Sequence, residues 1–404
     1  MKIGLLTHSV NPRGGVVHSI ELAHALHDLG HQVTVFAPAL PGQQFFRPLR
    51  CAASLVPVTH TPPEMVDMIA NRITAFESHI ESLLKTERFD VLHCHDGMGG
   101  NALANLQERG LIDGFVRTVH HLDNFSQPQI MHWQRRSVQQ AQQVLCVSRL
   151  WQEILARDHG ITAHEVNNGV DAQRYSSAPQ PADAALAKHL GITQNGPVIL
   201  SVGGVEPRKN TLRVLQAFIQ LRQQMPQLQL VIAGGASLLD HSSYAREFNT
   251  VLKATGIGSG PGQPVLLTGP LPDADMPALF RLASVVLMPS LKEGFGLVVL
   301  EALCSGRPVV VSRIAPFTGY LQEGDVCWAD PHDVASIAVA TMRALCTADP
   351  ARLACSAARL ASEFSWPRSA ARHARIYQRM ERQTSPRPAL PATAPLLQET
   401  APCP

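Results

Sequence analysis

Two adjacent cations have the residue types and the placement needed to hold a phosphorylated ligand. Arg208 and Lys209 stand side by side just before a helix that is expected to begin at Thr211. Cations are unfavourable at a helix N-terminus, which favours anions, so their placement indicates a negatively charged ligand between them. Arginine offers phosphate oxygens a planar fork, and lysine offers a point charge. The pair predicts a diphosphate site, with two solvated cations as the alternative.

The segment after Met288 carries a second signal for phosphate. An apolar strand ends there, and Pro289–Ala302 passes through a glycine-bearing loop into an apolar helix expected to begin near Gly296. The first backbone N–H groups of a helix have no partner within it. Those of Phe295, Gly296 and Leu297 are therefore expected to point at a phosphate.

Two carboxylates flank this helix start. Glu293 and Glu301 are eight positions apart, which returns them to within about 80° of the same helical face. Carboxylates accept hydrogen bonds from sugar and ribose hydroxyls. Glu301 lies in the otherwise apolar Leu297–Leu303, where an acid needs a partner. Both carboxylates are expected to line one cleft.

Two segments in the first half of the chain follow expected strands. Gly14 and Gly15 precede a helix from about Val17, so the backbone there can approach an anion, with a plain turn as the alternative. His120 leaves an apolar strand at the edge where open α/β sheets bind ligands. This placement indicates that His120 contacts a sugar or a phosphate. The alternative is that His120 has only a structural role.

Two other clusters have residue types that bind metals, but neither is expected to do so. Asp273-Ala-Asp275 precedes a helix-like run, where acids cap the helix and complement its dipole. His93-Cys-His-Asp96 has no second ligand cluster at a fitting spacing in the sequence. We expect no metal ion and no cofactor.

Composition excludes several classes of protein. The 404 residues are 45% hydrophobic and 16% charged, which predicts two or three domains with sizeable cores. With 34 basic and 32 acidic residues, neither nucleic acid nor an anionic membrane is expected as the main partner. No run reaches the ~18 apolar residues that span a bilayer, and the apolar N-terminus is too short for a signal peptide. The eight cysteines include no Cys-x-x-Cys pair, so we expect a cytoplasmic protein with reduced thiols.

Short apolar runs alternate with helix-like segments along the chain. Most runs are continuously apolar, as is typical of parallel strands covered on both faces, and the alternation predicts two open, doubly wound α/β sheets. We expect domains at 1–167 and 168–365, a junction at 168–195 and a disordered tail at 383–404. The expected strands are Ile3–Thr7, Gln32–Phe36, Val91–Cys94, Val116–His120, Val144–Val147, Val198–Val202, Leu228–Ile232, Val265–Leu267, Val285–Met288 and Pro308–Val311.

The segment from Glu293 to Glu301 resembles the Glu-x7-Glu signature of glycosyltransferase family 4, the retaining enzymes of GT-B fold. Further segments similar to the family follow in its order over about residues 1–382. They include Gly14-Gly15, Thr118-Val-His120, Asn168-Gly-Val-Asp171, Pro207-Arg-Lys-Asn210 and Phe364-Ser-Trp366 with Tyr377. The last looks like a helix, about 366–382, that returns to the N-terminal domain. The resemblance implies two Rossmann-like domains that face an interdomain cleft.

The resemblance also implies roles for matching residues. Arg208 and Lys209 would neutralise the diphosphate of a nucleotide-sugar donor. Glu293 would hold hydroxyls of the transferred sugar, Glu301 the ribose, and His120 would sit against the reacting sugar. His120, Lys209 and Glu293 are thus the expected catalytic residues. The expected donor-binding residues are Gly14, Gly15, Arg208, Lys209, Glu293, Gly294, Phe295, Gly296, Leu297 and Glu301.

We therefore expect retaining transfer of a hexosyl unit from a nucleotide diphosphate sugar, UDP-linked in preference to GDP- or ADP-linked. The acceptor would be a small molecule, a glycan or a lipid-linked molecule. No metal is needed where cations and helix N-termini stabilise the leaving group. The alternatives are an epimerase or phosphorylase of the same fold and a non-catalytic sugar-nucleotide sensor. Alanine variants of Lys209 and Glu293 are expected to lose transfer and keep the fold, since neither residue is expected in the core.

Four arginines fall in or directly beside the N-terminal loops 40–65 and 121–135, which are expected to form the acceptor pocket. They could meet an anionic acceptor or a lipid headgroup, which leaves contact with a membrane surface open, or be solvated surface residues. They are Arg47, Arg50, Arg135 and Arg136.

Overall fold

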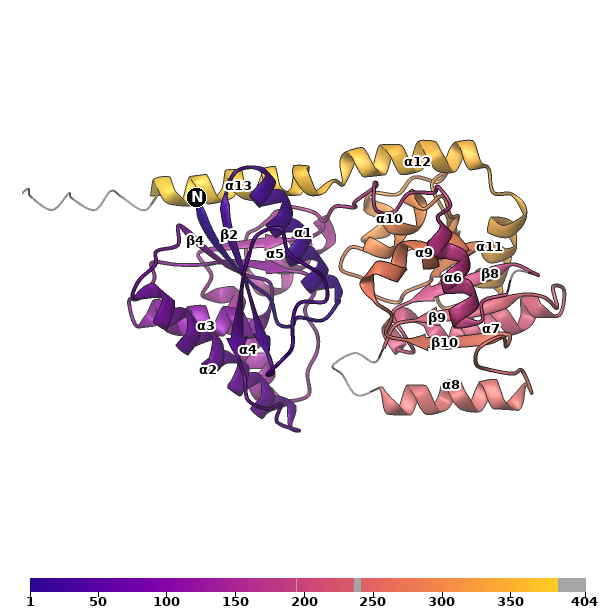
Figure 1. The fold of residues 1–404 in the computed structure, drawn as a ribbon, viewed down its shortest axis with the longest axis horizontal. Helices are drawn as coiled ribbons and strands as arrows, with labels where there is room; N and C mark the ends of the chain where they lie inside the picture. Colours follow the sequence, from indigo (N-terminus) through magenta and orange to yellow (C-terminus); the bar gives the residue numbers. More distant parts are fainter. Residues whose placement is uncertain (194, 236–240, 384–404) are drawn as a thin grey trace, which may run out of the picture.

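A computed structural model describes residues 1–193, 195–235 and 241–383 of the chain. Two parallel sheets with helices packed around each form two units that lie side by side (Figure 1). This arrangement confirms the two doubly wound α/β domains expected from the sequence. Of the expected tail, residues 384–404 lie outside the described residues.

The first sheet has seven parallel strands in the order β3-β2-β1-β4-β5-β6-β7. The interior strand β1 pairs with β2 on one side and with β4 on the other, so that Ile3 lies opposite Val33 and Val91. Strands in such positions are buried on both faces, which explains their continuous apolar runs. The strands are β1 Lys2–Leu6, β2 Gln32–Ala39, β3 Ala52–Pro57, β4 Val91–Cys94, β5 Val116–Val119, β6 Gln143–Cys146 and β7 Ala163–Glu165.

The second sheet has six parallel strands in the order β10-β9-β8-β11-β12-β13. Its strands are β8 Val198–Val202, β9 Gln229–Ala233, β10 Val265–Gly269, β11 Val285–Met288, β12 Val309–Ser312 and β13 Cys327–Ala329. In both sheets the chain order reverses direction once, beside β1 and beside β8, which creates the switch points where ligands bind in folds of this kind.

Helices and short 3-10 turns connect the strands. In the N-terminal half the helices are α1 Gly14–Asp28, α2 Met65–Leu84, α3 Gly97–Glu108, α4 Pro128–Gln139 and α5 Arg149–His159. In the C-terminal half they are α6 Pro181–Leu190, α7 Thr211–Arg222, α8 Ser242–Ala254, α9 Met276–Leu282, α10 Leu297–Cys304, α11 Val334–Cys346, α12 Pro350–Glu363 and α13 Trp366–Gln383. The 3-10 turns are η1 Pro207–Lys209, η2 Asp273–Asp275 and η3 Phe317–Gly319. Across the part of the chain that the structure describes, no helix is long and apolar enough to cross a membrane.

The last helix returns to the first domain. In Figure 1, α12 and α13 run along one side of the molecule, and α13 lies over the N-terminal domain beside α1. Trp366 and Tyr377 of α13 share an apolar cluster with Ile3, Leu22 and Val35. The N-terminal domain is therefore built from both ends of the described chain.

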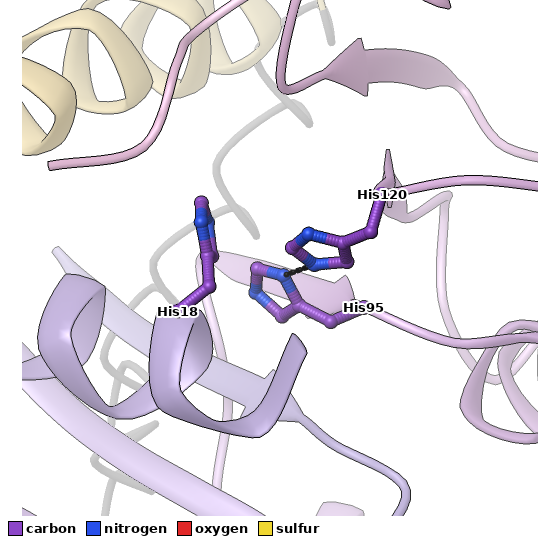
Figure 2. A group of neighbouring side chains, drawn as sticks. All are labelled: His18, His95 and His120. Atoms are coloured by element: carbon purple, nitrogen blue, oxygen red, sulfur yellow. Dashed lines mark hydrogen bonds between the residues drawn. The ribbon is translucent and has the colours of Figure 1, made fainter. Parts of the chain in front are cut away.

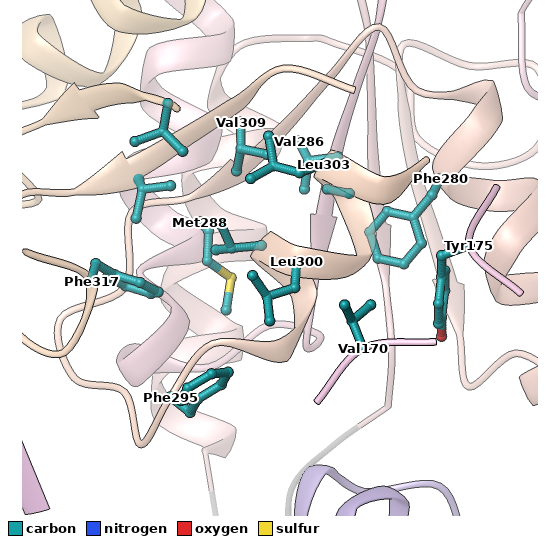
Figure 3. Packing of buried hydrophobic residues seen from close by; sticks show 14 of the residues in the cluster. Val170, Tyr175, Phe280, Val286, Met288, Phe295, Leu300, Leu303, Val309 and Phe317 are labelled. Carbon is teal, nitrogen blue, oxygen red and sulfur yellow. The ribbon is translucent and has the colours of Figure 1, made fainter. Parts of the chain in front are cut away.

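A second apolar cluster joins the two domains. It includes Val119 and Trp151 on the N-terminal side and continues to Phe295 and Leu300 on the C-terminal side. Figure 3 shows its C-terminal part, where α10 packs through Leu300 against the strands β11 and β12. This packing holds the start of α10 in place at the boundary between the domains.

The structure contains three strands and one helix that the sequence did not predict. The strands β3, β7 and β13 were not predicted, because each lies at the edge of its sheet, where a strand needs no continuous apolar run. The segment 168–195, expected as a junction, contains α6, which packs on α9. Asp183 of this segment pairs with Arg281 of α9 at 2.7 Å, which agrees with an expected C-terminal domain that includes residues 168–195.

Candidate functional site

The loops after β1, β5, β8 and β11 meet where the two domains touch. Across this boundary the Lys292 ammonium donates to the carbonyl oxygen of Leu122 at 2.9 Å. The Ser148 hydroxyl donates to the carbonyl oxygen of Gly294 at 2.8 Å. The loop after β11, which carries Glu293 and Gly294, thus contacts the N-terminal domain directly.

The two predicted cations lie on a 3-10 turn that precedes α7. Arg208 and Lys209 belong to η1, and Asn210, with φ of 60°, separates this turn from the first turn of the helix. The Asn210 amide donates to the carbonyl oxygens of Pro289 at 3.0 Å and Pro331 at 2.6 Å. These bonds tie the loop after β8 to the loop after β11, and so bring the cations to Glu293.

Glu293 is the centre of this charged group. The Lys209 Nζ lies 2.7 Å from Glu293 Oε1, and a guanidinium nitrogen of Arg208 lies 3.1 Å from Oε2. The Ser290 hydroxyl donates to Oε1 at 2.9 Å. Burial raises the pKa of Glu293, but Lys209 and Arg208 outweigh it and lower that pKa to about 2. Glu293 is therefore ionised at neutral pH.

The expectation that Lys209 and Glu293 lie outside the core was wrong. Lys209 is 9% exposed and Glu293 is 6% exposed. Burial lowers the pKa of Lys209, while the Glu293 carboxylate opposes that shift. Removing the charge of Lys209 or of Glu293 leaves the other residue buried without its main ion-pair partner. We therefore expect a variant at either position to lower stability as well as impair function.

The loop into α10 is closely packed at two glycines, Gly294 and Gly296. Gly296 is the N-cap of α10 with φ of 96°, and no side chain caps the helix there. A Cβ at Gly296 would meet the ring of Phe317 at 2.3 Å, and one at Gly294 would meet the His120 carbonyl oxygen at 2.3 Å. The uncapped start of α10 leaves backbone N–H groups available to an anion at this boundary.

The side chains of Phe295 and Leu297 have different surroundings: that of Phe295 is buried, and that of Leu297 lines a pocket. The Phe295 ring is 3% exposed and stacks on the ring of Tyr320, with centroids 5.1 Å apart. Its side chain belongs to the core, so that only its backbone can serve a ligand. Leu297 is partly buried and lines a small pocket with Glu301 and Tyr175.

Glu301 is half-buried in that pocket and is hydrogen-bonded to the Tyr175 hydroxyl. Burial raises the pKa of Glu301 to about 7, although Tyr175 and Arg174 lower it in part. Burial also raises the pKa of Tyr175, which keeps its hydroxyl proton. Sequence reasoning missed Tyr175 and Arg174, which follow Asn168-Gly-Val-Asp171 in a segment read as a junction.

The carboxylate of Asp273 lies near the pocket of Glu301 and acts on it through its negative charge. Its carboxylate lies 2.7 Å from Arg174 and 3.5 Å from Arg47 of the N-terminal domain. Its role is therefore an ion pair across the domains. Asp275, at the N-cap of α9, makes no side-chain cap, so the capping role expected for Asp273-Ala-Asp275 was wrong.

His120 faces the first turn of α1. A Cβ at Gly15 would lie 3.5 Å from its ring, whereas one at Gly14 would meet nothing within 4 Å. The Nε2 of His120 lies 3.3 Å from Nδ1 of His95, and His18 of α1 packs edge-on against the His120 ring (Figure 2). Burial lowers the pKa of His120 well below its ordinary value, so the ring is neutral at pH 7.

The four arginines of the expected acceptor loops differ in their surroundings. Arg47 pairs with Glu21 at 2.7 Å, and Arg50 pairs with Asp28 at 2.7 Å. Arg136 pairs with Glu108 at 2.9 Å, and Arg135 is exposed. Three of the four are thus engaged in ion pairs within the chain.

Two family models match this chain. One, described as Glycosyltransferase Family 4, matches residues 12–174, and the other, described as Glycosyl transferases group 1, matches residues 183–358. Together they cover both domains.

Individual relatives are similar over most of their length. A D-inositol 3-phosphate glycosyltransferase of Salinispora arenicola is 31% identical over 314 residues, which are 72% of this chain and 68% of that protein. A phosphatidyl-myo-inositol mannosyltransferase of Mycobacterium leprae is 28% identical over 337 residues, 81% of this chain and 82% of that protein. Among solved structures, Anabaena HepE in complex with UDP-glucose superposes with a TM-score of 0.72 at 20% identity, over 94% of this chain and 100% of that one.

Proposed function

Because the chain belongs to glycosyltransferase family 4 and has the GT-B fold, we propose that it is a retaining, metal-independent hexosyltransferase. The donor is a nucleotide diphosphate sugar, with UDP as the favoured nucleotide. The acceptor is a hydroxyl of a polyol that carries a phosphate. The observation that carries this proposal is the Glu293 carboxylate held between Lys209 and Arg208 beside the uncapped start of α10.

The charged group suits a donor diphosphate. An ammonium has three donor hydrogens and a guanidinium has five, so Lys209 and Arg208 can keep Glu293 and still contact phosphate oxygens. The N–H groups at the start of α10 add partial positive charge on the same side. Glu293, ionised and fixed by Ser290, remains free at its other lone pairs to accept hydroxyls of the sugar.

The transfer breaks the bond between the anomeric carbon and the diphosphate oxygen. The acceptor oxygen forms the new bond on the same face, and its proton passes to the departing diphosphate, so that atoms and charge balance. Charge builds up on the diphosphate as the first bond lengthens, and Lys209, Arg208 and the α10 N-terminus stabilise it there. His120 would hold the reacting sugar against the N-terminal domain, beside Gly14 and Gly15.

The nucleoside half of the donor is assigned to the pocket of Glu301. Its carboxylate can accept hydrogen bonds from ribose hydroxyls while Tyr175 holds the carboxylate in place. Preference for UDP is supported by the solved relative that contains UDP-glucose. The phosphorylated polyol acceptor is supported by the names of the sequence relatives, which act on inositol phosphate and phosphatidyl-myo-inositol.

Basic side chains of the N-terminal domain suit such an acceptor. Burial lowers the pKa of His8, which follows β1, and Arg13, His121 and Arg117 lower it further, while Asp96 opposes them. His8 and Arg13 follow β1 and His121 follows β5, which places them at the ligand-binding end of the first sheet. We also place the reaction in the cytoplasm, which is supported by seven free cysteines among the described residues.

The experiment is a panel of UDP-, GDP- and ADP-sugars in excess chelator, scored by thermal shift and then by transfer to inositol phosphate. We expect one UDP-sugar to stabilise the protein, and the product to keep the anomeric configuration of the donor by NMR coupling. Loss of transfer in chelator that Mg²⁺ restores, or an inverted product, would overturn the mechanism.

Matched lysine variants locate the donor. Lys209→Met should abolish the donor-induced shift, whereas Lys188→Met, at an exposed position of α6 in the same domain, should keep it. Nucleotide release without an acceptor at the full rate would favour an epimerase or a hydrolase over a transferase.

A further inference from the structure

Three histidines from separate elements of the N-terminal domain converge on one point. His18 lies in α1, His95 follows β4, and His120 follows β5. Each ring offers one nitrogen, and these three nitrogens all lie within 4.8 Å of one another. Figure 2 shows the His18 ring edge-on beside the rings of His95 and His120, which a hydrogen bond joins.

Two of these rings have buried nitrogens without a partner in the described part of the chain. His18 Nδ1 bonds Asn168 Oδ1 at 2.8 Å, and its Nε2 has no partner. His95 Nδ1 bonds His120 Nε2 at 3.3 Å, and its own Nε2 has no partner. His18 is fully buried and His95 is 4% exposed. A buried polar atom without a partner costs about 1–3 kcal/mol and calls for a ligand or another compensation.

The hydrogen bond to Asn168 sets the protonation of the His18 ring. An amide oxygen can only accept, so Nδ1 carries the hydrogen and Nε2, which has no partner, keeps its lone pair free for a ligand. A ligand histidine in a metal site is oriented in the same way by an acceptor on its far nitrogen. His93, the neighbouring histidine of β4, uses both ring nitrogens on Tyr377 and Thr118, so it is not a candidate ligand.

We propose that His18, His95 and His120 form a binding site for a divalent transition-metal ion of the Zn²⁺ class. Three neutral imidazoles and an open fourth position are a typical donor set for zinc, with bond lengths of about 2.0–2.1 Å. That geometry places the nitrogens ~3.4 Å apart, so the rings move together on binding and the His95–His120 hydrogen bond is replaced by metal bonds. The linear spacing of these residues shows no metal motif, which is why the sequence did not reveal a second ligand cluster beside His93-Cys-His-Asp96.

A metal at this site would inhibit the transferase. This consequence rests on the proposed function, in which His120 holds the donor sugar. An ion bound to His120 removes that nitrogen from the sugar, so metal and donor exclude each other. Metal binding and donor binding are measured separately, so that failure of one is distinguishable from failure of the other.

The test is a titration of the full, metal-stripped chain with Co²⁺ and then Zn²⁺. We expect one ion per chain, with visible d–d absorption of the Co²⁺ form and without the near-ultraviolet charge transfer of a cysteine ligand. Zn²⁺ should displace the Co²⁺. A thiolate signal, or no saturable binding of one ion, would overturn the site and leave the donor-site assignment untouched.

Histidine variants then place the ion. His95→Gln and His18→Gln should each lose the one-ion binding, whereas His164→Gln, at an exposed position of β7, should keep it. Circular dichroism and thermal unfolding without metal check that each variant is folded. Binding that survives in folded His95→Gln, or that is lost equally in His164→Gln, would overturn the proposal.

The competition is tested with the donor. In wild-type protein, Zn²⁺ should weaken the donor-induced thermal shift in proportion to its occupancy, and chelator should restore it. His95→Gln should bind donor without this sensitivity to zinc. Donor binding that is independent of Zn²⁺ in metal-loaded protein would contradict the competition.

Discussion

The buried carboxylate of Glu293 makes ion pairs or hydrogen bonds with three side chains. Lys209, Arg208 and Ser290 surround its carboxylate, and together they outweigh the cost of burying it. In a donor complex the same cations must also serve the diphosphate. The carboxylate thus holds the cations in position before the donor arrives, which reduces the reorganisation needed during transfer.

The buried pair predicts non-additive variants. Lys209→Met should abolish transfer and lower the free energy of unfolding by about 3 kcal/mol, because Glu293 keeps its charge and loses its nearest partner. Adding Glu293→Gln removes that charge, so the double variant should be more stable than Lys209→Met alone. Urea unfolding of the single and double variants measures the difference, and strictly additive losses would contradict the coupling.

Glu301 predicts a pH dependence of stability. Its pKa of about 7 in the folded protein lies above its ordinary value, so the native state binds more protons between pH 4.5 and 7. The contribution of Glu301 to stability is therefore present at low pH and is lost as pH rises toward 7. Relative to wild type, Glu301→Gln should gain up to about 3 kcal/mol of stability on going from pH 4.5 to 8.

The measurement is urea unfolding at both pH values. Glu247→Gln, which neutralises an exposed acid of α8, serves as the control and should show little change between them. An equal response of the two variants would argue that Glu301 is ionised throughout this range in the folded protein.

At the scale of elements, the start of α10 depends on two glycines that accept no Cβ. Gly296 is constrained within its own domain by Phe317, whereas Gly294 is constrained by the carbonyl of His120 in the other domain. The loop therefore serves two purposes: one glycine shapes the helix start, and the other lets the domains touch.

Gly294→Ala should separate these two purposes. Its Cβ would lie 2.3 Å from the His120 carbonyl oxygen, so the domains must move apart while the C-terminal domain keeps its own packing. We expect transfer to fall by about 100-fold, as for a misplacement of ~1 Å, with the nucleotide-induced thermal shift retained. Gly319→Ala, whose Cβ would meet nothing within 4 Å, should keep full transfer. Loss of nucleotide binding in Gly294→Ala would instead indicate damage within the C-terminal domain.

The strands that the sequence missed all lie at sheet edges, although the edge strand β10 was predicted. The central strands β1, β8 and β11 appear as continuous apolar runs, while β3 has an exposed Ala52 and Ala53 and a half-buried Ser54. Edge strands are defined by the neighbour they pair with, and that neighbour is not visible in a short stretch of sequence.

The same limit applies to the site. Arg208, Lys209, Glu293 and Glu301 were predicted because each conflicts with its local surroundings: two cations near a helix start and two acids near apolar runs. His18 and His95 show no such conflict. They meet His120 only because three elements converge in the folded chain, so their role could not be predicted from the spacing along it.

At the scale of the whole molecule, the two domains are joined by polar contacts as well as by an apolar cluster. Arg47 of the N-terminal domain lies between Glu21 of its own domain and Asp273 of the other. Lys292 and Ser148 add hydrogen bonds across the same boundary. In this structure the two domains therefore touch through ion-pair, hydrogen-bond and apolar contacts.

Arg47→Ala should shift the molecule toward an open arrangement. It removes the ion pair with Asp273 and leaves the partly buried Glu21 without its cation. We expect a larger radius of gyration by small-angle X-ray scattering and a higher KM for the donor. Arg50→Ala removes an ion pair that lies entirely within the N-terminal domain and should change neither. An unchanged radius in Arg47→Ala would show that the apolar contacts alone keep the domains closed.

The return of α13 to the first domain has a consequence for how the protein is made. The chain leaves the N-terminal domain near Asn167 and comes back at Ser365, where Val170 and Ser365 run side by side. Between these points the ribosome must synthesise the whole C-terminal domain. The first domain to emerge therefore lacks the side chains of Trp366 and Tyr377 that cover Ile3 and Leu22, and it stays incomplete until the last helix is released. A premature stop codon late in the gene would thus damage the domain encoded at its beginning.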